Sequence, residues 1–114
     1  MQTRFAILLP LVLACAGVAA QPSLSPARQQ ELVRMVRQDC GSCHGMQLTG
    51  GLGPPLTSAA LANQPVQSMA ATIFYGRPGT PMPPWSSFVT EPEAQWIAEQ
   101  LFAGFPPLPA RPLP

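Results

Sequence analysis

The sequence contains no lysine and few charged residues of any kind. Only 10% of its 114 residues are charged, the net charge is +1, and all six basic residues are arginines. Proteins that bind DNA or RNA present basic patches, which this composition does not supply. We therefore expect no nucleic-acid partner, and the short length predicts at most one compact domain.

Histidine and cysteine are also scarce, with one His and three Cys in the chain. A structural zinc site needs four Cys or His ligands, and beyond the N-terminal leader only Cys40, Cys43 and His44 are available. A thioredoxin-like cysteine pair would lie near a βαβ pattern, which the sequence does not contain. A plain disulfide between the two cysteines would leave the adjacent histidine without a role.

The N-terminal apolar run is too short for a comfortable membrane span. Residues 1–20 contain Arg4, then an apolar run from Phe5 to Ala16 and small residues before Gln21. This pattern is typical of a signal peptide that is removed before Gln21, whereas a bilayer span needs roughly 20 apolar residues. An alternative is lipoprotein processing at Cys15, which would anchor the protein to a membrane. We favour the first interpretation, which predicts an exported, periplasmic protein.

The most informative motif is Cys40-Gly41-Ser42-Cys43-His44. Two thiols at this spacing fit the two vinyl groups of one haem, and the next residue supplies an imidazole. The five-residue pattern indicates c-type haem attachment. We predict one covalently attached haem c, with His44 as an axial ligand of its iron.

Met82 is the candidate for the second axial ligand. It lies 38 positions beyond His44, far enough along the chain to reach the opposite haem face, and prolines flank it on both sides. Those prolines lower the entropy cost of presenting a weak thioether ligand, and Met/His ligation is common in cytochromes c. Met69 is the other possibility, but its place on an apolar helical stripe favours a role in the core.

Two further residues near Met82 belong to the predicted site. Trp85 is expected to pack near the haem. Arg77 either pairs with a haem propionate or faces solvent, and the sequence leaves both possibilities open.

The pattern of caps and apolar residues predicts an all-α fold of three to four helices around the haem. Ser25-Pro26 indicates a helix start, and Thr90 with Glu93 forms a capping box before the last helix. Helices are expected at about 26–39, 65–75 and 91–103, with a short helical turn at 57–61. The predicted domain spans residues 21–104, followed by an extended or disordered proline-rich tail at 105–114.

The order of helix, Cys-x-x-Cys-His, Gly-Pro-x-Leu, helix, Met loop and helix resembles that of class I cytochromes c. More narrowly, residues 38–45, 48–54 and 80–85 resemble the NirC family, small periplasmic cytochromes encoded beside the cd-type nitrite reductase of denitrifiers. The class resemblance implies that the Pro54 carbonyl accepts a hydrogen bond from His44 and that Leu56 packs against the haem. The alternative is that Pro54 and Pro55 are turn residues only.

The NirC resemblance implies electron donation to a cd-type nitrite reductase, or a part in the maturation of its haem d1. With both axial positions filled, iron cannot bind a substrate, so we expect a monomeric electron carrier rather than an enzyme. The alternative is a five-coordinate or Met-labile haem protein that acts in ligand binding or haem d1 assembly. Lysine rings steer many cytochromes c to acidic partners. Because this chain has no lysine, we expect docking through apolar contact.

Overall fold

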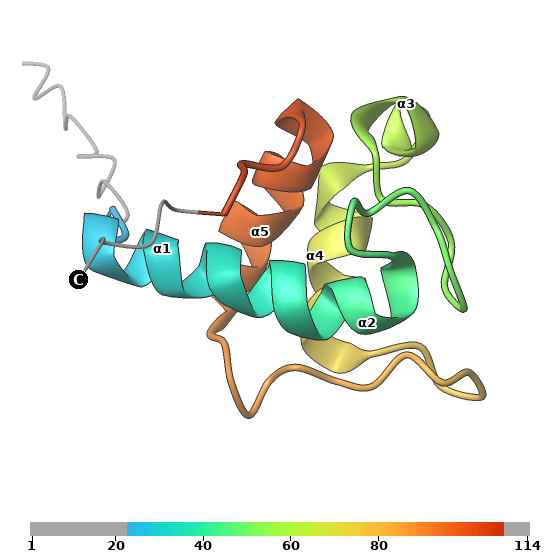
Figure 1. Ribbon diagram of the computed structural model, residues 1–114. Coiled ribbons are helices and arrows are strands. Elements are labelled where there is room, and N and C mark those ends of the chain that lie inside the picture. The colour runs from blue at the N-terminus through green and yellow to red at the C-terminus, as the bar shows by residue number, and fades with distance from the viewer. Residues whose placement is uncertain (1–22, 109–114) are drawn as a thin grey trace, which may run out of the picture.

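The computed structural model describes residues 23–108, which are helical and contain no strand (Figure 1). The expected signal peptide, the possible lipid site at Cys15 and the end of the tail lie outside these residues. The elements are α1 (Pro26–Met35), the π-helical turn η1 (Val36–Cys40), α2 (Gly41–His44), α3 (Ser58–Leu61), α4 (Val66–Tyr75) and α5 (Glu91–Ala103).

The first helix is longer than the sequence predicted. It begins as expected, with the Ser25 hydroxyl accepting a hydrogen bond from the Arg28 N–H and proline at the first helical position. The predicted end near Asp39 is wrong, because η1 and α2 continue the helix to His44. In η1 the Gly41 N–H bonds to the Val36 carbonyl, five residues back, so the helix accommodates one extra residue.

Two later helices, α3 and α5, begin at side-chain caps, whereas α4 follows Pro65 without one. The Thr57 hydroxyl accepts a hydrogen bond from the Ala60 N–H at the start of α3. Thr90 and Glu93 form the capping box of α5, each side chain accepting from the other's backbone N–H. Gly76 follows the end of α4 and Gly104 follows the end of α5.

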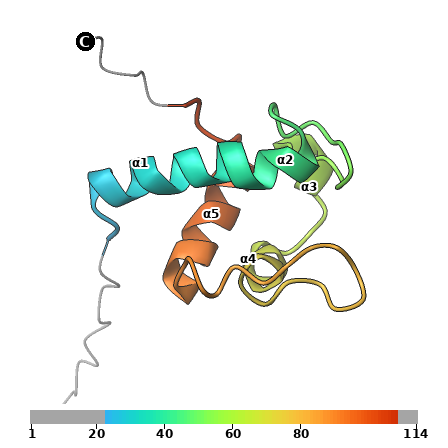
Figure 2. The same ribbon diagram turned by 60° about the horizontal axis from the view of Figure 1, so that its bottom comes forward.

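The α1–α2 helix crosses α5, and α4 packs along α5, so that all of them contribute to one core (Figures 1 and 2). Small residues on α5, Ala94 and Ala98, are almost fully buried and let its neighbours approach closely. The core cluster contains Leu32, Val36, Leu48, Leu56, Leu61, Met69, Ala70, Ile73, Val89, Ala94, Ile97, Ala98 and Leu101. Met69 is therefore a core residue, as its position on the α4 stripe predicted.

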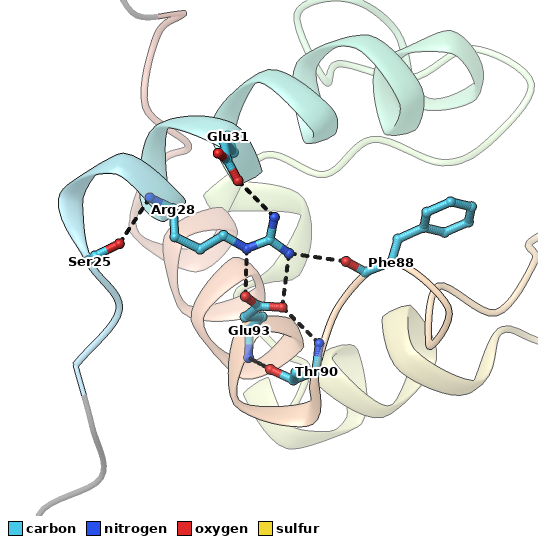
Figure 3. Close-up of polar contacts among 6 residues, drawn as sticks. All are labelled: Ser25, Arg28, Glu31, Phe88, Thr90 and Glu93. Carbon is cyan, nitrogen blue, oxygen red and sulfur yellow. Dashed lines mark hydrogen bonds and ion pairs between the residues drawn. The ribbon is translucent and has the colours of Figure 1, made fainter.

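A polar cluster joins the start of α1 to the start of α5 (Figure 3). Arg28 donates from Nε to Oε1 of Glu93 at 2.6 Å and from Nη2 to Oε2 at 3.2 Å. Its Nη2 also donates to the Phe88 carbonyl at 3.1 Å, and Nη1 pairs with Glu31 at 3.0 Å. The Arg28 side chain thus fixes the junction of the two helices.

A second arginine of the first helix binds the chain after α5. Arg37 donates to the carbonyls of Phe105 and Pro106 at 2.8 to 3.1 Å, and its guanidinium lies 5.3 Å from the centre of the Phe105 ring. Phe105 also packs against the core cluster. The described start of the tail is thus non-helical, and Phe105 and Pro106 are held against the first helix.

Candidate haem site

The Cys-x-x-Cys-His motif forms the C-terminal end of the first helix. Cys40 is the last residue of η1, and Cys43 and His44 lie in α2. Helical residues three or four apart share a face, so the two thiols and the imidazole lie on one side of this helix. Cys40 is half-buried, and burial raises the pKa of its thiol to about 11, whereas Cys43 is exposed.

The imidazole of His44 has one ring nitrogen already engaged. Its Nδ1 lies 2.7 Å from the carbonyl oxygen of Pro54. A carbonyl can only accept a hydrogen bond, so Nδ1 carries the proton and Nε2 keeps its lone pair. This contact therefore selects the tautomer in which Nε2 can bind a metal, an arrangement typical of metal-ligating histidines.

The loop after His44 folds back on α2 through backbone hydrogen bonds. The Gly50 N–H donates to the His44 carbonyl and the Gly53 N–H donates to the Cys43 carbonyl, both at 2.8 Å. The Leu56 N–H donates to the Leu48 carbonyl at 2.8 Å, and both leucine side chains are buried in the core. These bonds hold the loop that carries Pro54 against the end of the helix that carries His44.

Gly53 approaches the His44 ring too closely for any side chain. A Cβ added to Gly53 would lie 2.7 Å from Cε1 and 2.8 Å from Nδ1 of the imidazole. Real Cβ atoms do not come this near to other atoms, so a larger residue would displace the ring or the loop. The ring is thus fixed by the Pro54 carbonyl at one edge and by the Gly53 backbone beside it.

Met82 lies on the loop between α4 and α5, which extends toward the same end of the molecule as α2 in both views (Figures 1 and 2). The Met82 side chain is half-buried. Its backbone N–H donates to the Thr80 hydroxyl at 3.4 Å, and its carbonyl accepts from the Arg77 N–H at 3.2 Å. Hydrogen bonds among residues of this loop therefore hold Met82 in place.

The two other predicted residues on this loop differ in surroundings. Trp85 is half-buried, packs against the core, and has its ring centre 5.6 Å from that of Phe88. The Trp85 N–H donates to the Ile73 carbonyl at 3.1 Å, which ties the end of the loop to α4. The Arg77 side chain is exposed.

The donor set fits a haem better than a metal ion bound by protein alone. Within residues 23–108 there is no group of three or more His, Cys, Asp or Glu side chains that could hold a metal. Both described cysteines are free thiols, His44 offers Nε2, and Met82 offers a soft sulfur. Two thiols for covalent attachment and an imidazole with a fixed tautomer are what a c-type haem requires. The helical fold and this site define a c-type cytochrome.

Comparisons with known proteins agree with this class. The family described as "Cytochrome C oxidase, cbb3-type, subunit III" matches residues 27–100. Cytochrome c55X of Paracoccus denitrificans is 53% identical over 98 residues, which cover 86% of this chain and 92% of that protein. The chain belongs to the family of small c-type cytochromes that includes cytochrome c55X and NirC, and members of this family bind haem.

Two solved structures are similar to this chain in both fold and sequence. The c-type cytochrome NirC has a TM-score of 0.69 and 48% identity, and the match covers 70% of this chain and 94% of NirC. The dihydro-heme d1 dehydrogenase NirN, solved in complex with DHE, has a TM-score of 0.59 and 28% identity. That match covers 73% of this chain and only 17% of NirN, so the likeness concerns one part of that protein.

Three features of the structure were not predicted from the sequence. The π-helical turn before the haem motif leaves no signal in apolar spacing. The ion pair between Arg28 and Glu93 joins residues 65 positions apart. The close approach of Gly76 to the backbone of residues 82–84 was also not predicted, because a glycine after a helix normally indicates only the helix end.

The helices of the described residues include none that is both long and apolar enough to cross a membrane.

Proposed function

We propose that this protein is a periplasmic monohaem c-type cytochrome that carries single electrons to a cd-type nitrite reductase or a related haem d1 protein. The observation that best supports the proposal is the contact between His44 Nδ1 and the Pro54 carbonyl, which leaves Nε2 free beside two thiols. When bound, haem supplies the one-electron iron couple. The residues of this chain attach it, ligate its iron and exclude water from it.

Each site residue has a specific role in this proposal. The Cys40 and Cys43 thiols would hold the haem covalently through its two vinyl groups. His44 and Met82 would ligate the haem iron, and a thioether ligand raises the reduction potential relative to a second imidazole. Leu56 would pack against the haem, Trp85 would shield the Met82 side of the site, and the exposed Arg77 would pair with a propionate.

The relatives support the proposed partner. NirC is similar over nearly its whole length, and NirN, whose name refers to haem d1 chemistry, contains a similar part. The signal-like residues 1–20 and the haem motif support export to the periplasm. The likeness to NirN also favours a second candidate role, in which the protein exchanges electrons during haem d1 maturation.

Replacement of the proposed thioether ligand tests this function. We expect Met82→Ala to remove the long-wavelength charge-transfer band of the ferric protein, lower the reduction potential and allow rapid binding of carbon monoxide. The control is Met46→Ala, since Met46 is exposed and lies next to the haem motif on the His44 side. A wild-type protein that lacks the band and binds carbon monoxide at once would contradict the ligand assignment and favour the five-coordinate or Met-labile alternative.

The partner is tested separately by stopped-flow mixing of the reduced protein with purified cd-type nitrite reductase and, in parallel, with a haem d1 dehydrogenase. Rapid oxidation by the reductase would support the electron-carrier role. Exchange with the dehydrogenase alone would favour the role in maturation.

A further inference from the structure

Gly76 lies at the end of α4 in direct contact with the backbone of the segment that carries Met82. Its φ of 72° and ψ of −173° fall in a region that only glycine adopts readily. A Cβ at this position would lie 2.7 Å from the Pro84 nitrogen, 2.8 Å from the Pro83 carbonyl carbon and 2.9 Å from the Met82 carbonyl oxygen. All three atoms belong to the backbone, so a side chain could be accommodated only by moving the segment 82–84.

Hydrogen bonds on both sides of this contact hold the segment in place. The Arg77 N–H donates to the Met82 carbonyl at 3.2 Å, and the Trp85 N–H donates to the Ile73 carbonyl at 3.1 Å. Pro83 and Pro84 restrict the backbone between these two bonds. The segment therefore has little freedom to absorb a displacement at Gly76 by bending elsewhere.

The same loop contains a glycine without such a contact. Gly79 has a similar φ of 78°, but a Cβ added there would meet no atom within 4 Å. Substitution of Gly79 would therefore introduce backbone strain at a positive φ without pushing on the Met82 segment. Both glycines have a positive φ, but only a side chain at Gly76 would meet the Met82 segment, so Gly79→Ala serves as the control for a substitution at positive φ.

We propose that Gly76 is a positioning residue for Met82: its missing side chain lets the Met82–Pro84 backbone close against α4, which sets the reach of the thioether toward the haem iron. This inference rests on the proposed function, in which Met82 is an axial ligand. A side chain at Gly76 shifts the equilibrium from Met82 bound to Met82 released, because only the released state tolerates the displaced segment.

The test compares Gly76→Ala and Gly79→Ala as full-length holoproteins. We expect Gly76→Ala to bind carbon monoxide roughly 10- to 100-fold faster than wild type, because displacement of the Met82–Pro84 segment raises the population of the state in which Met82 is released. We also expect a weaker long-wavelength charge-transfer band and a lower reduction potential. Gly79→Ala should resemble wild type in its carbon monoxide rate, its charge-transfer band and its reduction potential. A Gly76→Ala protein with the band, potential and carbon monoxide rate of wild type would overturn the proposal.

A double variant shows whether Gly76 acts through Met82. If it does, Gly76→Ala combined with Met82→Ala will have the same potential and carbon monoxide rate as Met82→Ala alone. Additive effects of the two substitutions would overturn the proposal. A wild-type protein without the charge-transfer band would overturn the ligand assignment itself, and with it any positioning role for Gly76.

Pro84→Gly covers the case in which Gly76→Ala does not accumulate as a folded holoprotein. It keeps Gly76 and relaxes the same segment, so we expect a smaller acceleration of carbon monoxide binding. An unchanged rate in Pro84→Gly, together with failure of Gly76→Ala to fold, would mean that Gly76 serves the fold alone and would overturn the proposal.

Discussion

Glu93 is the only charged side chain that is buried within the described residues. Its carboxylate accepts two hydrogen bonds from Arg28 and one from the Thr90 N–H (Figure 3). The hydrogen bonds from Arg28, followed by that from the Thr90 backbone, hold the pKa of Glu93 below its ordinary value. The same pairing raises the pKa of Arg28 above its usual range, so both groups are ionised at neutral pH.

The depressed pKa makes the Glu93 carboxylate a source of stability that depends on pH. The unfolded carboxyl binds a proton more tightly than the folded one, so its contribution is complete above the unfolded pKa of about 4.3. It is lost as pH falls through the lower pKa of the folded state. We expect Glu93→Gln to reduce the free energy of unfolding at neutral pH by about 1.5–3 kcal/mol, and to flatten the decline toward acid pH. Denaturant unfolding of the holoprotein from about pH 7 to about pH 3 measures both effects.

The control for this prediction is Glu31→Gln. Glu31 pairs with the same arginine, but its side chain is 60% exposed, so solvent screens the pair. We expect its loss to change the free energy of unfolding by no more than about 0.5 kcal/mol. Equal losses in the two variants would contradict the distinction between the buried and the exposed partner.

At the scale of elements, the cap of α5 decides where the last helix begins. The Thr90 hydroxyl accepts a hydrogen bond from the Glu93 N–H, and Glu93 in turn binds the Thr90 N–H. We expect Thr90→Ala to reduce the free energy of unfolding by about 1 kcal/mol, because the Glu93 N–H in the first turn of the helix loses the hydroxyl that accepts its hydrogen bond. Thr90→Ser keeps the hydroxyl and should lie within about 0.5 kcal/mol of wild type. Thermal unfolding of both holoproteins checks this, and an equal loss in both would show that the cap is not responsible.

Elements with strong local signals could be predicted from the sequence almost to the residue. The expected helices at 65–75 and 91–103 correspond to α4 and α5. A capping box precedes α5 and a glycine follows each helix, and these signals act within one turn of the chain. The end of the first helix could not be predicted. Whether Gly41 bonds four or five residues back depends on how the helix packs, and apolar spacing does not record it.

The candidate site divides in the same way. Cys40, Cys43, His44 and Met82 were predicted from residue type and spacing, and the contact between His44 and Pro54 was predicted from a family resemblance. The closeness of Gly53 to the imidazole and of Gly76 to the Met82 segment depends on which backbones meet in the folded chain. The residues next to a glycine in the sequence do not show which backbone it contacts in the fold. The close contacts of Gly53 and Gly76 could therefore be recognised only in the structure.

At the scale of the whole molecule, charge is distributed unevenly along the chain. Between residues 45 and 90, which include the histidine-side loop and the Met82 loop, Arg77 is the one charged residue. Exposed apolar side chains in the same region include Leu52, which is 94% exposed, and Met46, which is 63% exposed. A partner that docks on this region meets apolar surface with almost no charge.

This distribution predicts weak dependence of electron transfer on salt. We expect the bimolecular rate with a cd-type nitrite reductase to change less than about twofold between roughly 10 and 200 mM salt, because there is little charge to screen. Stopped-flow oxidation measures the rate. Gln47→Lys combined with Thr49→Lys adds charge to two exposed positions and serves as the positive control, for which the rate should become salt-sensitive. A fall of about tenfold or more for the wild type would contradict docking through apolar contact.

The two arginine contacts of the first helix have a consequence for the order in which the molecule can assemble. Arg28 meets a residue 65 positions later in the chain and Arg37 meets one 69 positions later. Synthesis runs from the N-terminus, so the helix that carries both arginines finds these partners only after residues 93 and 106 have been added. Such long loops must close before their contacts contribute, which slows folding relative to a bundle of sequential neighbours. A nascent chain that stops short of Pro106 therefore lacks the carbonyl that accepts hydrogen bonds from Arg37 of the first helix.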